Sequence, residues 1–353
     1  MKEAKGIDIN MNVVYYSSDF FSEMCGVAIE SLCENNKASK EIDVYIVEDH
    51  ISLNYKEKLK SITDKFSRKL FFIKMPTQFE AYSEVKVNLG RTYARMLLED
   101  LLPQTVDRVI SFDSDTIVLD SIEELYNTDF EGDYIAGVYD CVGSAIQKKV
   151  LHADEKMKYC NAGMYLVDLK AWRRDKVGDK LIQAVLEACK NKRYMYFLEQ
   201  DLMNIIFEGK IKLLSPRYNM LTSIYLFDYA DVIRMKKPIS YYEKEEVNAA
   251  KKNPAILHAT TCFYVKKRMW VENSDHPYAK LYLDLRNRTP WKDEPQIRDN
   301  RKKSKKFFAT IWHCIPKKCA ILFAAVLINY IRPTYAKVTV RIALSLIAEQ
   351  SST

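Results

Sequence analysis

Short apolar runs alternate with helical patterns along most of this chain, and this alternation constrains the fold more than any other feature. In chain order, the strand-like runs and helical patterns occupy residues 13–16, 24–34, 42–47, 54–66, 70–73, 91–102, 108–112, 134–139, 164–167, 179–189 and 201–207. Strands that alternate with helices at this spacing are typical of a largely parallel sheet with helices on both faces. The sequence therefore predicts an α/β fold, in which ligands bind beyond the carboxyl ends of the strands.

The charge of the chain is concentrated at its C-terminal end. Residues 292–353 carry twelve Lys and Arg against four Asp and Glu, a surplus of 8 (12 − 4). The whole chain has a net charge of +7, so the first 291 residues sum to −1. Because this body has no basic surplus, we expect it to bind no nucleic acid. We place a boundary near 292, with one domain over 1–292 and a basic, apolar, helical tail over 293–353.

The tail has the pattern of a segment that lies on a membrane. Five of the six residues 301–306 are basic, and apolar runs follow at 319–330 and 338–348. A membrane-spanning helix needs about twenty apolar residues, which neither run reaches. A helix on an anionic membrane surface fits better, while a pair of helices packed on the body, or a subunit interface, remains the alternative. We expect a chain cut after residue 292 to leave membranes and still hydrolyse its substrate.

The eight cysteines and the N-terminal residues indicate a reducing compartment. The cysteines include no CxxC pair, and several lie inside apolar runs, where a free thiol acts as a small hydrophobe. Residues 1–10 contain no apolar stretch typical of a signal peptide. We therefore expect a cytoplasmic protein, held at the inner face of the membrane by its tail.

Asp113 and Asp115 follow the apolar run at 109–112 and are the first candidates for chemistry. Two carboxylates two residues apart point to the same side of an extended segment. Their oxygens suit Mg²⁺ or Mn²⁺, and a cation held there could neutralise a diphosphate leaving group. The alternative is an ordinary polar turn. His258 follows a second apolar run, at 255–257, and could add a third ligand, although a buried structural histidine is the alternative.

Two further motifs lie near predicted secondary-structure ends. Asn161, Ala162 and Gly163 precede a strand, where small side chains allow close approach of a ligand, or merely a tight turn. Glu199 and Gln200 precede a predicted helix and could face a substrate. The residue that follows them, Asp201, fits the N-cap of that helix.

Together these motifs resemble family 8 retaining glycosyltransferases, which include bacterial lipopolysaccharide α-galactosyl- and α-glucosyltransferases and glycogenin. The resemblance covers about residues 11–292, and its pieces occur in the order of the family. These pieces are residues 13–32, 92–95, 112–115, 161–163, 166–169 with Trp172, 199–204, His258, 276–277 and 289–292.

The resemblance implies a GT-A fold, with a Rossmann-like mixed sheet flanked by helices, a UDP-sugar donor and Mn²⁺ or Mg²⁺. It assigns the metal to Asp113, Asp115 and His258. It also implies a set of donor-binding residues: Tyr16, Ser17, Ser18 and Asp19 at the uridine, Arg95 and Ser114 along the donor, Asn161, Ala162 and Gly163 beside the sugar, and one cation among Lys266, Lys267 and Arg268 at the diphosphate. The catalytic contacts to sugar or acceptor fall to Asp140, Glu199 and Gln200.

Three positions depart from the family pattern. The uracil-binding carboxylate of relatives falls near Ser18, with Asp19 one place later. Glu199 stands where relatives often have Asp. The stretch from His258 to Trp270 is longer than in relatives and contains no glycine.

The resulting interpretation is a retaining hexosyltransferase that moves glucose or galactose from a UDP-sugar to a glycan or lipid-linked glycan during cell-surface polysaccharide or lipopolysaccharide synthesis. Retention through a covalent intermediate would need a carboxylate nucleophile on the opposite face of the sugar. Glu199 and Gln200 are the candidates for that position, and Gln200 is a poor nucleophile. We therefore expect front-face attack.

A catalytically weak nucleotide-sugar-binding protein is one alternative. A metal-dependent phosphoesterase is another, but no carboxylates for a second metal lie beside Asp113. The chain has no GxGxxG motif or P-loop, which argues against dehydrogenases and P-loop ATPases.

Overall fold

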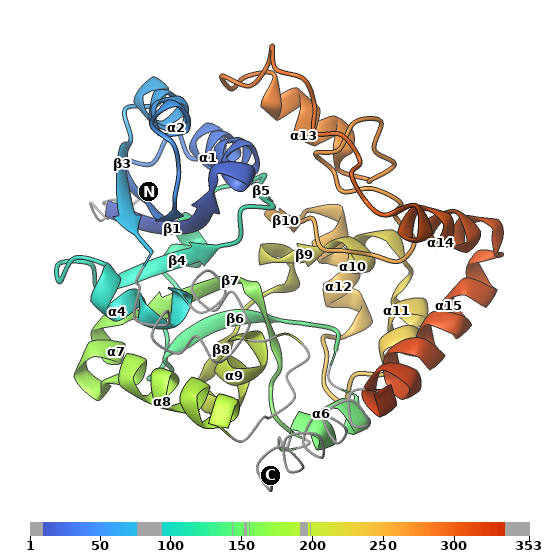
Figure 1. The fold of residues 1–353 in the computed structure, drawn as a ribbon. Coiled ribbons are helices and arrows are strands. Elements are labelled where there is room, and N and C mark those ends of the chain that lie inside the picture. The colour runs from blue at the N-terminus through green and yellow to red at the C-terminus, as the bar shows by residue number, and fades with distance from the viewer. Residues whose placement is uncertain are drawn as a thin grey trace, which may run out of the picture.

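A seven-stranded sheet forms the centre of the protein, in a computed structural model that describes residues 10–75, 94–142, 144–151, 154, 156–190, 197 and 199–335 (Figure 1). The strand order is β3-β2-β1-β4-β7-β6-β8. The strands are β1 (Asn10–Ser18), β2 (Glu41–Asp49), β3 (Lys69–Lys74), β4 (Arg108–Phe112), β6 (Ile135–Tyr139), β7 (Cys160–Asp168) and β8 (Ile211–Leu213).

The sheet is mixed, because β7 runs antiparallel to both of its neighbours, β4 and β6. The other pairings within this seven-stranded sheet are parallel. The predicted largely parallel sheet is thus confirmed for every strand of this sheet except β7. The antiparallel register places Met164 opposite Phe112, so the middle of β7 lies beside the end of β4.

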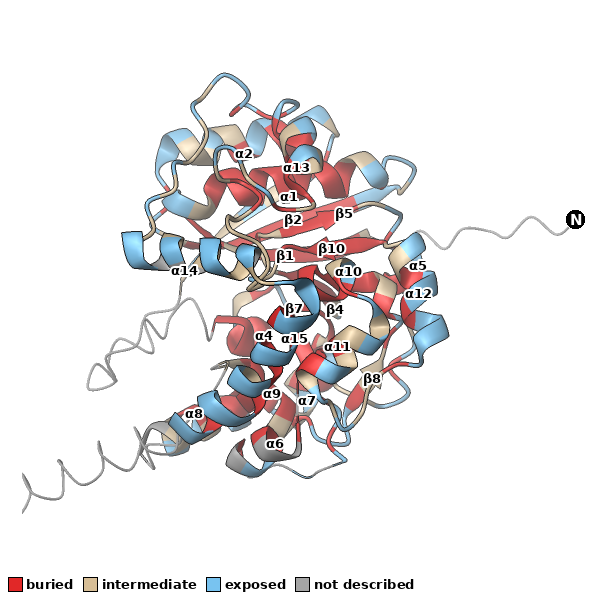
Figure 2. Cartoon of the chain, turned by 90° about the vertical axis from the view of Figure 1, so that its right-hand side faces the viewer, coloured by how far each residue is buried: buried red, intermediate tan, exposed pale blue. Residues whose placement is uncertain are grey.

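Helices cover both faces of the sheet, as the alternating pattern predicted (Figure 2). Successive side chains of a strand point to opposite faces, so Val13 and Tyr15 pack into one core and Val14 packs into the other. The first core is covered by α1 (Ser22–Asn35), α2 (Leu53–Lys65) and α13 (Ala279–Arg286). The second is covered by α4 (Leu98–Leu101), α7 (Leu169–Asp175), α8 (Val177–Lys190) and α9 (Glu199–Ile206).

A small second sheet places His258 beside the aspartate motif of residues 113–115. Its order is β5-β10-β9, formed by β5 (Thr116–Val118), β10 (Ile256–His258) and β9 (Met220–Leu221). In the antiparallel pairing of β5 with β10, His258 lies opposite Thr116. The N–H of Ala259 donates to the carbonyl of Asp115 at 2.9 Å. This pairing brings the histidine next to the aspartate motif.

The helix α15 (Lys317–Val326) packs on the body beside α11 (Tyr229–Lys236). Ala320, Ile321 and Ala324 of α15 are buried, and α15 lies along α11 (Figure 1). None of the helices in the described ranges is both long and apolar enough to cross a membrane. The remaining helices are α5 (Glu123–Tyr126), α6 (Ala145–Leu151), α10 (Thr222–Leu226), α11 (Tyr229–Lys236), α12 (Lys244–Lys252), α14 (Lys303–Cys314) and α15 (Lys317–Val326), with short 3₁₀ or π turns at η1 (Asp19–Phe21), η3 (Ala94–Leu97), η4 (Pro216–Tyr218) and η5 (Leu327–Ile331).

The boundaries of several elements differ from the predicted ones, and the differences at β7 and α9 concern the site. β7 begins at Cys160 and not at residue 164, because Cys160 pairs with Tyr139 of β6. α9 begins at Glu199, so Asp201 lies inside its first turn and is not the N-cap. The predicted helix at 91–102 is described only from Ala94, and the apolar run at 338–348 lies outside the described residues.

Candidate active site

Three potential metal ligands meet where β4 and β10 end. Asp113 and Asp115 follow β4, and His258 is the last residue of β10. The ligand atoms of the three residues lie within 4.8 Å of one another. The Nε2 of His258 is 3.2 Å from Oδ1 of Asp115 and 3.7 Å from Oδ2 of Asp113. The structure thus brings together the three residues that the sequence singled out for a metal.

A chain of amides fixes which nitrogen of His258 carries the proton. The N–H of Gly163 donates to Oδ1 of Asn161 at 3.0 Å, which identifies this atom as the amide oxygen. The same oxygen accepts from Nδ2 of Asn219 at 3.0 Å, so Oδ1 of Asn219 faces Nδ1 of His258, also at 3.0 Å. Nδ1 therefore carries a hydrogen, and Nε2, once it has lost its own proton, can offer its lone pair to a metal held by the aspartates.

The packing of β7 against β10 requires glycine at residue 163. A Cβ on Gly163 would lie 1.9 Å from Cε1 of His258, far closer than two carbon atoms can approach. The carbonyl of Gly163 accepts the N–H of Asp113 at 2.9 Å. One glycine thus contacts both the imidazole and the aspartate loop.

The electrostatics of the cluster suit a bound cation. Burial opposes the charged form of both partners, but Asp115 raises the pKa of His258 and His258 lowers the pKa of Asp115. Each partner therefore stabilises the ionised form of the other. The two carboxylates supply the oxygen ligands that Mn²⁺ and Mg²⁺ prefer, and an unprotonated imidazole nitrogen can add a third ligand. The donor set and the orientation of His258 fit the metal that the sequence predicted.

Arg95 is a buried cation beside this cluster. Its Nη2 lies 2.6 Å from Oδ1 of Asp113, and its guanidinium lies over the ring of Tyr16 at 5.2 Å. It also donates to the carbonyl of Ala162. Its Nε is buried, has no hydrogen-bond partner among the described residues, and is 3.9 Å from Oε1 of Glu199. Arg95 therefore links the aspartate loop to the start of α9.

Two cavities meet at the cluster and share Asp113, Asp115 and Arg268. The larger has a volume of about 580 Å³ and the smaller of about 480 Å³, both within the range of ligand sites. The larger cavity is lined by Tyr16, Ser17, Phe20, Phe21, Arg95, Asp113, Ser114, Asp115, Arg268, Trp270, Val271 and residues 297–301. The smaller cavity is lined by the shared residues and by Asp140, Val142, Asn161, Ala162, Gly163, Phe197, Glu199, Gln200, Leu221, Ser223, Lys236, His258, Thr260 and Thr261.

A buried amide network forms one wall of the smaller cavity. Gln200 accepts from the N–H of Ala162 at 2.9 Å and donates to Oδ2 of Asp140 at 3.1 Å. Asn161 donates to the same carboxylate oxygen at 2.9 Å. Beside them, burial raises the pKa of Glu199 to about 7, with the charge of Arg95 opposing and that of Asp113 adding to the shift. The cavity thus contains one firmly hydrogen-bonded carboxylate and one that changes charge near neutral pH.

Four of the predicted donor-binding residues line neither cavity. Ser18 is buried, and Oδ1 of Asp19 accepts the N–H of Ser52 at 2.7 Å beside α2. The N–H groups of Lys266 and Lys267 both donate to Asp275, each at 2.9 Å. Of the three cations that the sequence left open, Arg268 is the one that reaches the cavities, and its Nη1 is 3.3 Å from Oδ2 of Asp115.

Sequence reasoning missed several residues that shape the site. The aromatic pair Phe20 and Phe21, which follows Asp19 just after β1, is a signal that was available. Asn219 and residues 297–301 carry no recognisable motif, because they reach the site only through the tertiary fold.

Comparisons with known proteins agree with this geometry. The sequence profile of Glycosyl transferase family 8 matches residues 12–262, more than half of the chain. The chain is 26% identical over 283 residues to general stress protein A of Bacillus subtilis, covering 80% of this chain and 94% of that protein. It is 22% identical over 288 residues to a lipopolysaccharide 1,2-glucosyltransferase of Escherichia coli, covering 80% of each. A crystal structure of the galactosyltransferase LgtC with donor and acceptor sugar analogues has a TM-score of 0.66 at 20% identity, covering 80% of this chain and 99% of that one. The fold is thus GT-A-like.

Proposed function

The chain belongs to glycosyl transferase family 8, and on that premise we propose that it is a retaining, metal-dependent hexosyltransferase that moves glucose or galactose from a UDP-sugar to a glycan acceptor in cell-surface polysaccharide or lipopolysaccharide synthesis. One observation carries the proposal: the Asp113, Asp115 and His258 cluster lies where two cavities meet. A nucleotide occupies the larger cavity and the sugar with its acceptor occupies the smaller one, so the bond that breaks lies at the cluster.

The relatives support the choice of sugar. The similar proteins include a lipopolysaccharide 1,2-glucosyltransferase of Escherichia coli and a lipopolysaccharide 1,3-galactosyltransferase of Salmonella typhimurium. At 22% and 21% identity they favour a hexose donor without choosing between the two sugars.

The nucleotide cavity has the surfaces that a nucleoside diphosphate needs. Phe20, Phe21 and Trp270 offer aromatic faces for a base. Arg95 and Arg268 supply charge for phosphates at the end where the metal ligands lie. Mn²⁺ or Mg²⁺, when held by the cluster, would neutralise charge that develops on the departing diphosphate.

The sugar cavity favours front-face attack over a covalent intermediate. The amide of Gln200 already bonds to Ala162 and Asp140, and an amide is a poor nucleophile. Glu199 lies close to Arg95, and its pKa is raised to about 7. Below neutral pH it is therefore mostly protonated, and a protonated carboxyl is a poor nucleophile. In this mechanism the leaving phosphate takes the proton of the acceptor. A sugar ester trapped on Glu199 and detected by mass spectrometry would contradict it.

The first test measures release of UDP from a panel of UDP-sugars with Mn²⁺ and with EDTA. We expect release from one sugar, dependent on metal and lost in Asp113→Asn/Asp115→Asn. Asp120→Asn is the matched control, because Asp120 is an exposed aspartate that lines neither cavity. Binding of UDP without turnover of any sugar, even with candidate acceptors, would favour a nucleotide-sugar-binding protein. No binding would overturn the proposal.

We also propose that the tail holds the protein on the anionic inner surface of a membrane. Leu322, Phe323 and Val326 of α15 are 47–58% exposed, while Ala320 and Ala324 on the other side are buried. Residues 301–335 contain eight Lys and Arg and no Asp or Glu. An exposed apolar face with flanking cations is what binds an amphipathic helix to anionic lipid.

Sedimentation with vesicles tests the tail. The full chain should pellet with vesicles that contain phosphatidylserine, and Leu322→Ser/Phe323→Ser should pellet much less. The control, Leu53→Ser on α2, removes a side chain that is 78% exposed but distant in sequence from the tail. Equal sedimentation of all three proteins would contradict the membrane role.

A further inference from the structure

Residues 297–301 form part of the wall of the nucleotide cavity, although they follow the part of the chain that matches the family. The cavity is lined by Ile297, Arg298, Asp299, Asn300 and Arg301, whereas the family match ends at residue 262. The segment lies between α13 and α14, where the chain passes from the body into the tail (Figure 1). A segment supplied by the beginning of the tail therefore completes a cavity that the body begins.

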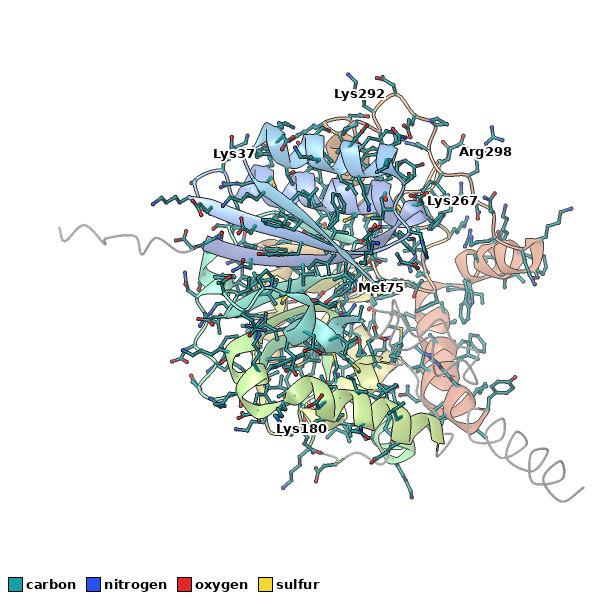
Figure 3. All side chains as sticks on the ribbon, turned by 60° about the vertical axis from the view of Figure 1, so that its left-hand side comes forward. Lys37, Met75, Lys180, Lys267, Lys292 and Arg298 are labelled. Carbon is teal, nitrogen blue, oxygen red and sulfur yellow. The ribbon has the colours of Figure 1, made fainter. Side chains whose placement is uncertain are left out.

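Backbone contacts fasten this segment to the loop that follows β10. Ile297 forms a parallel bridge with Val271, and the N–H of Glu272 donates to the carbonyl of Ile297 at 2.9 Å. Figure 3 shows Lys267 and Arg298 at the same end of the molecule, on the two stretches of chain that this bridge joins. Because the loop also carries Arg268 and Trp270, the bridge holds the segment against other lining residues.

An internal ion pair fixes the rest of the segment. Arg301 donates to both carboxylate oxygens of Asp299, each at 2.9 Å, and Nζ of Lys306 donates to the carbonyl of Asp299 at 2.7 Å. The hydrogen bonds from Arg301 lower the pKa of Asp299 to about 2. The pair therefore stays charged over the physiological range, and the segment has a defined shape without a ligand.

Of the four arginines that line the cavity, three pair with a carboxylate among the described residues. Arg95 pairs with Asp113, Arg268 with Asp115, and Arg301 with Asp299. The fourth arginine of the lining, Arg298, has no ion pair with any residue in the ranges that the structure describes. An arginine without a carboxylate partner at the edge of a cavity attracts an anion, and a diphosphate is a strong acceptor for its guanidinium.

We propose that residues 297–301 are a nucleotide-binding element in which Arg298 supplies a cation to the diphosphate of a nucleoside-diphosphate donor. This rests on the proposed function, which places a nucleotide in the larger cavity. It assigns the start of the tail to donor binding and the part after residue 301 to surface attachment. A cut at 292 would then remove part of the donor site, and a cut that separates the two roles would lie after 301.

Calorimetric titration of the full-length protein with UDP, in saturating Mn²⁺, tests the element without needing the acceptor. Arg298→Ala removes the cation, and the dissociation constant for UDP should rise roughly fivefold to tenfold. Asp299→Asn/Arg301→Gln keeps the net charge but breaks the internal pair, and it should weaken UDP binding by a similar factor. Lys303→Ala is the matched control, because it removes an exposed cation five residues after Arg298 that does not line the cavity.

The outcomes separate this inference from the proposed function. If the unaltered protein and the control bind UDP, and both segment variants bind it more weakly, the element is supported. If all four proteins bind UDP equally, the element is overturned while the proposed function stands. If the unaltered protein binds no UDP, both are overturned. Uridine without phosphates gives a further check, because Arg298→Ala should leave its binding unchanged.

Discussion

Gly163 gives the most direct prediction at the scale of single residues. Its missing side chain is what allows the His258 ring to lie against β7 with Nε2 facing the aspartates. In Gly163→Ala the ring must move, because the added Cβ would lie 1.9 Å from Cε1 of His258. Changes that disturb the orientation of a metal-binding histidine typically weaken metal binding about 10- to 100-fold. We expect a loss of this size for Mn²⁺, measured by calorimetry.

The control for this variant is another crowded glycine of the same sheet. In Gly137→Ala the new Cβ would lie 2.9 Å from ring atoms of Tyr165, a residue that lines neither cavity. This variant should unfold more easily and still bind Mn²⁺ with unchanged affinity. Equal metal affinity in both variants would show that the contact between Gly163 and His258 does not position the ligand.

Glu199 predicts a pH dependence of stability in metal-free protein. Its pKa rises from 4.5 to about 7 on folding, so the folded state retains a proton that the unfolded state has lost between these values. The free energy of unfolding therefore falls as pH rises from 5 to 8, by up to about 3 kcal/mol at about 1.4 kcal/mol per pKa unit. Glu199→Gln cannot ionise, so its stability should fall less over this range.

Urea unfolding in EDTA at several pH values measures this difference. Glu123→Gln, which changes an exposed glutamate of α5, should follow the unaltered protein at each pH. If the profiles of Glu199→Gln and the unaltered protein run parallel, the raised pKa of Glu199 is not the cause of the pH dependence.

At the scale of elements, the start of α9 depends on a buried carboxylate. The fully buried Asp201 accepts the N–H of Phe197 at 2.8 Å and the hydroxyl of Tyr159. Asp201→Ala leaves both donors without this acceptor, which should lower the free energy of unfolding by about 2–4 kcal/mol. The first turn of α9 carries Glu199 and Gln200, so turnover should fall as well.

A double-variant cycle distinguishes this contact from a general packing effect. Tyr159→Phe removes one of the two donors, so Asp201→Ala should cost less in that background than in the unaltered protein. Additive losses in free energy of unfolding, measured with urea, would mean that the two residues act independently.

The helices and strands that have a clear period could be predicted from the sequence, and the aspartate motif could be placed at a strand end. The direction of β7 could not, because a short apolar strand carries no local signal for parallel or antiparallel pairing. The start of β7 also has no local signal in the sequence, so residues 161–163 were expected before the strand although they lie inside it.

The candidate metal ligands were predictable for a different reason. Asp113, Asp115 and His258 are chemically distinctive residues that each follow or end an apolar run. Asn219 was not predictable, because it acts on His258 through a single amide contact from a loop. The 297–301 segment was not predictable either, since only the bridge between Val271 and Ile297 brings it back to the cavity.

At the scale of the whole molecule, the cluster predicts that a divalent cation stabilises the fold. A ligand that binds only the folded state at about 100 times its dissociation constant raises the free energy of unfolding by about 2.7 kcal/mol. We expect Mn²⁺ to do so in the unaltered protein and to have little effect in Asp115→Asn, as measured by thermal or urea unfolding. Asp120→Asn should respond to Mn²⁺ as the unaltered protein does. A cation effect of equal size in all three proteins would place the ion elsewhere.

Because β10 carries His258, the candidate metal site can form only after the chain has been synthesised as far as β10. In the pairing of β5 with β10, His258 lies opposite Thr116, 142 positions earlier in the chain (258 − 116). The ribosome therefore synthesises both aspartates and every strand of the large sheet before it reaches His258. A nascent or prematurely terminated chain that ends before β10 would carry most of the scaffold without the complete ligand set. Under the proposed function, an unfinished copy of this protein would lack the complete metal site and would not turn over its donor.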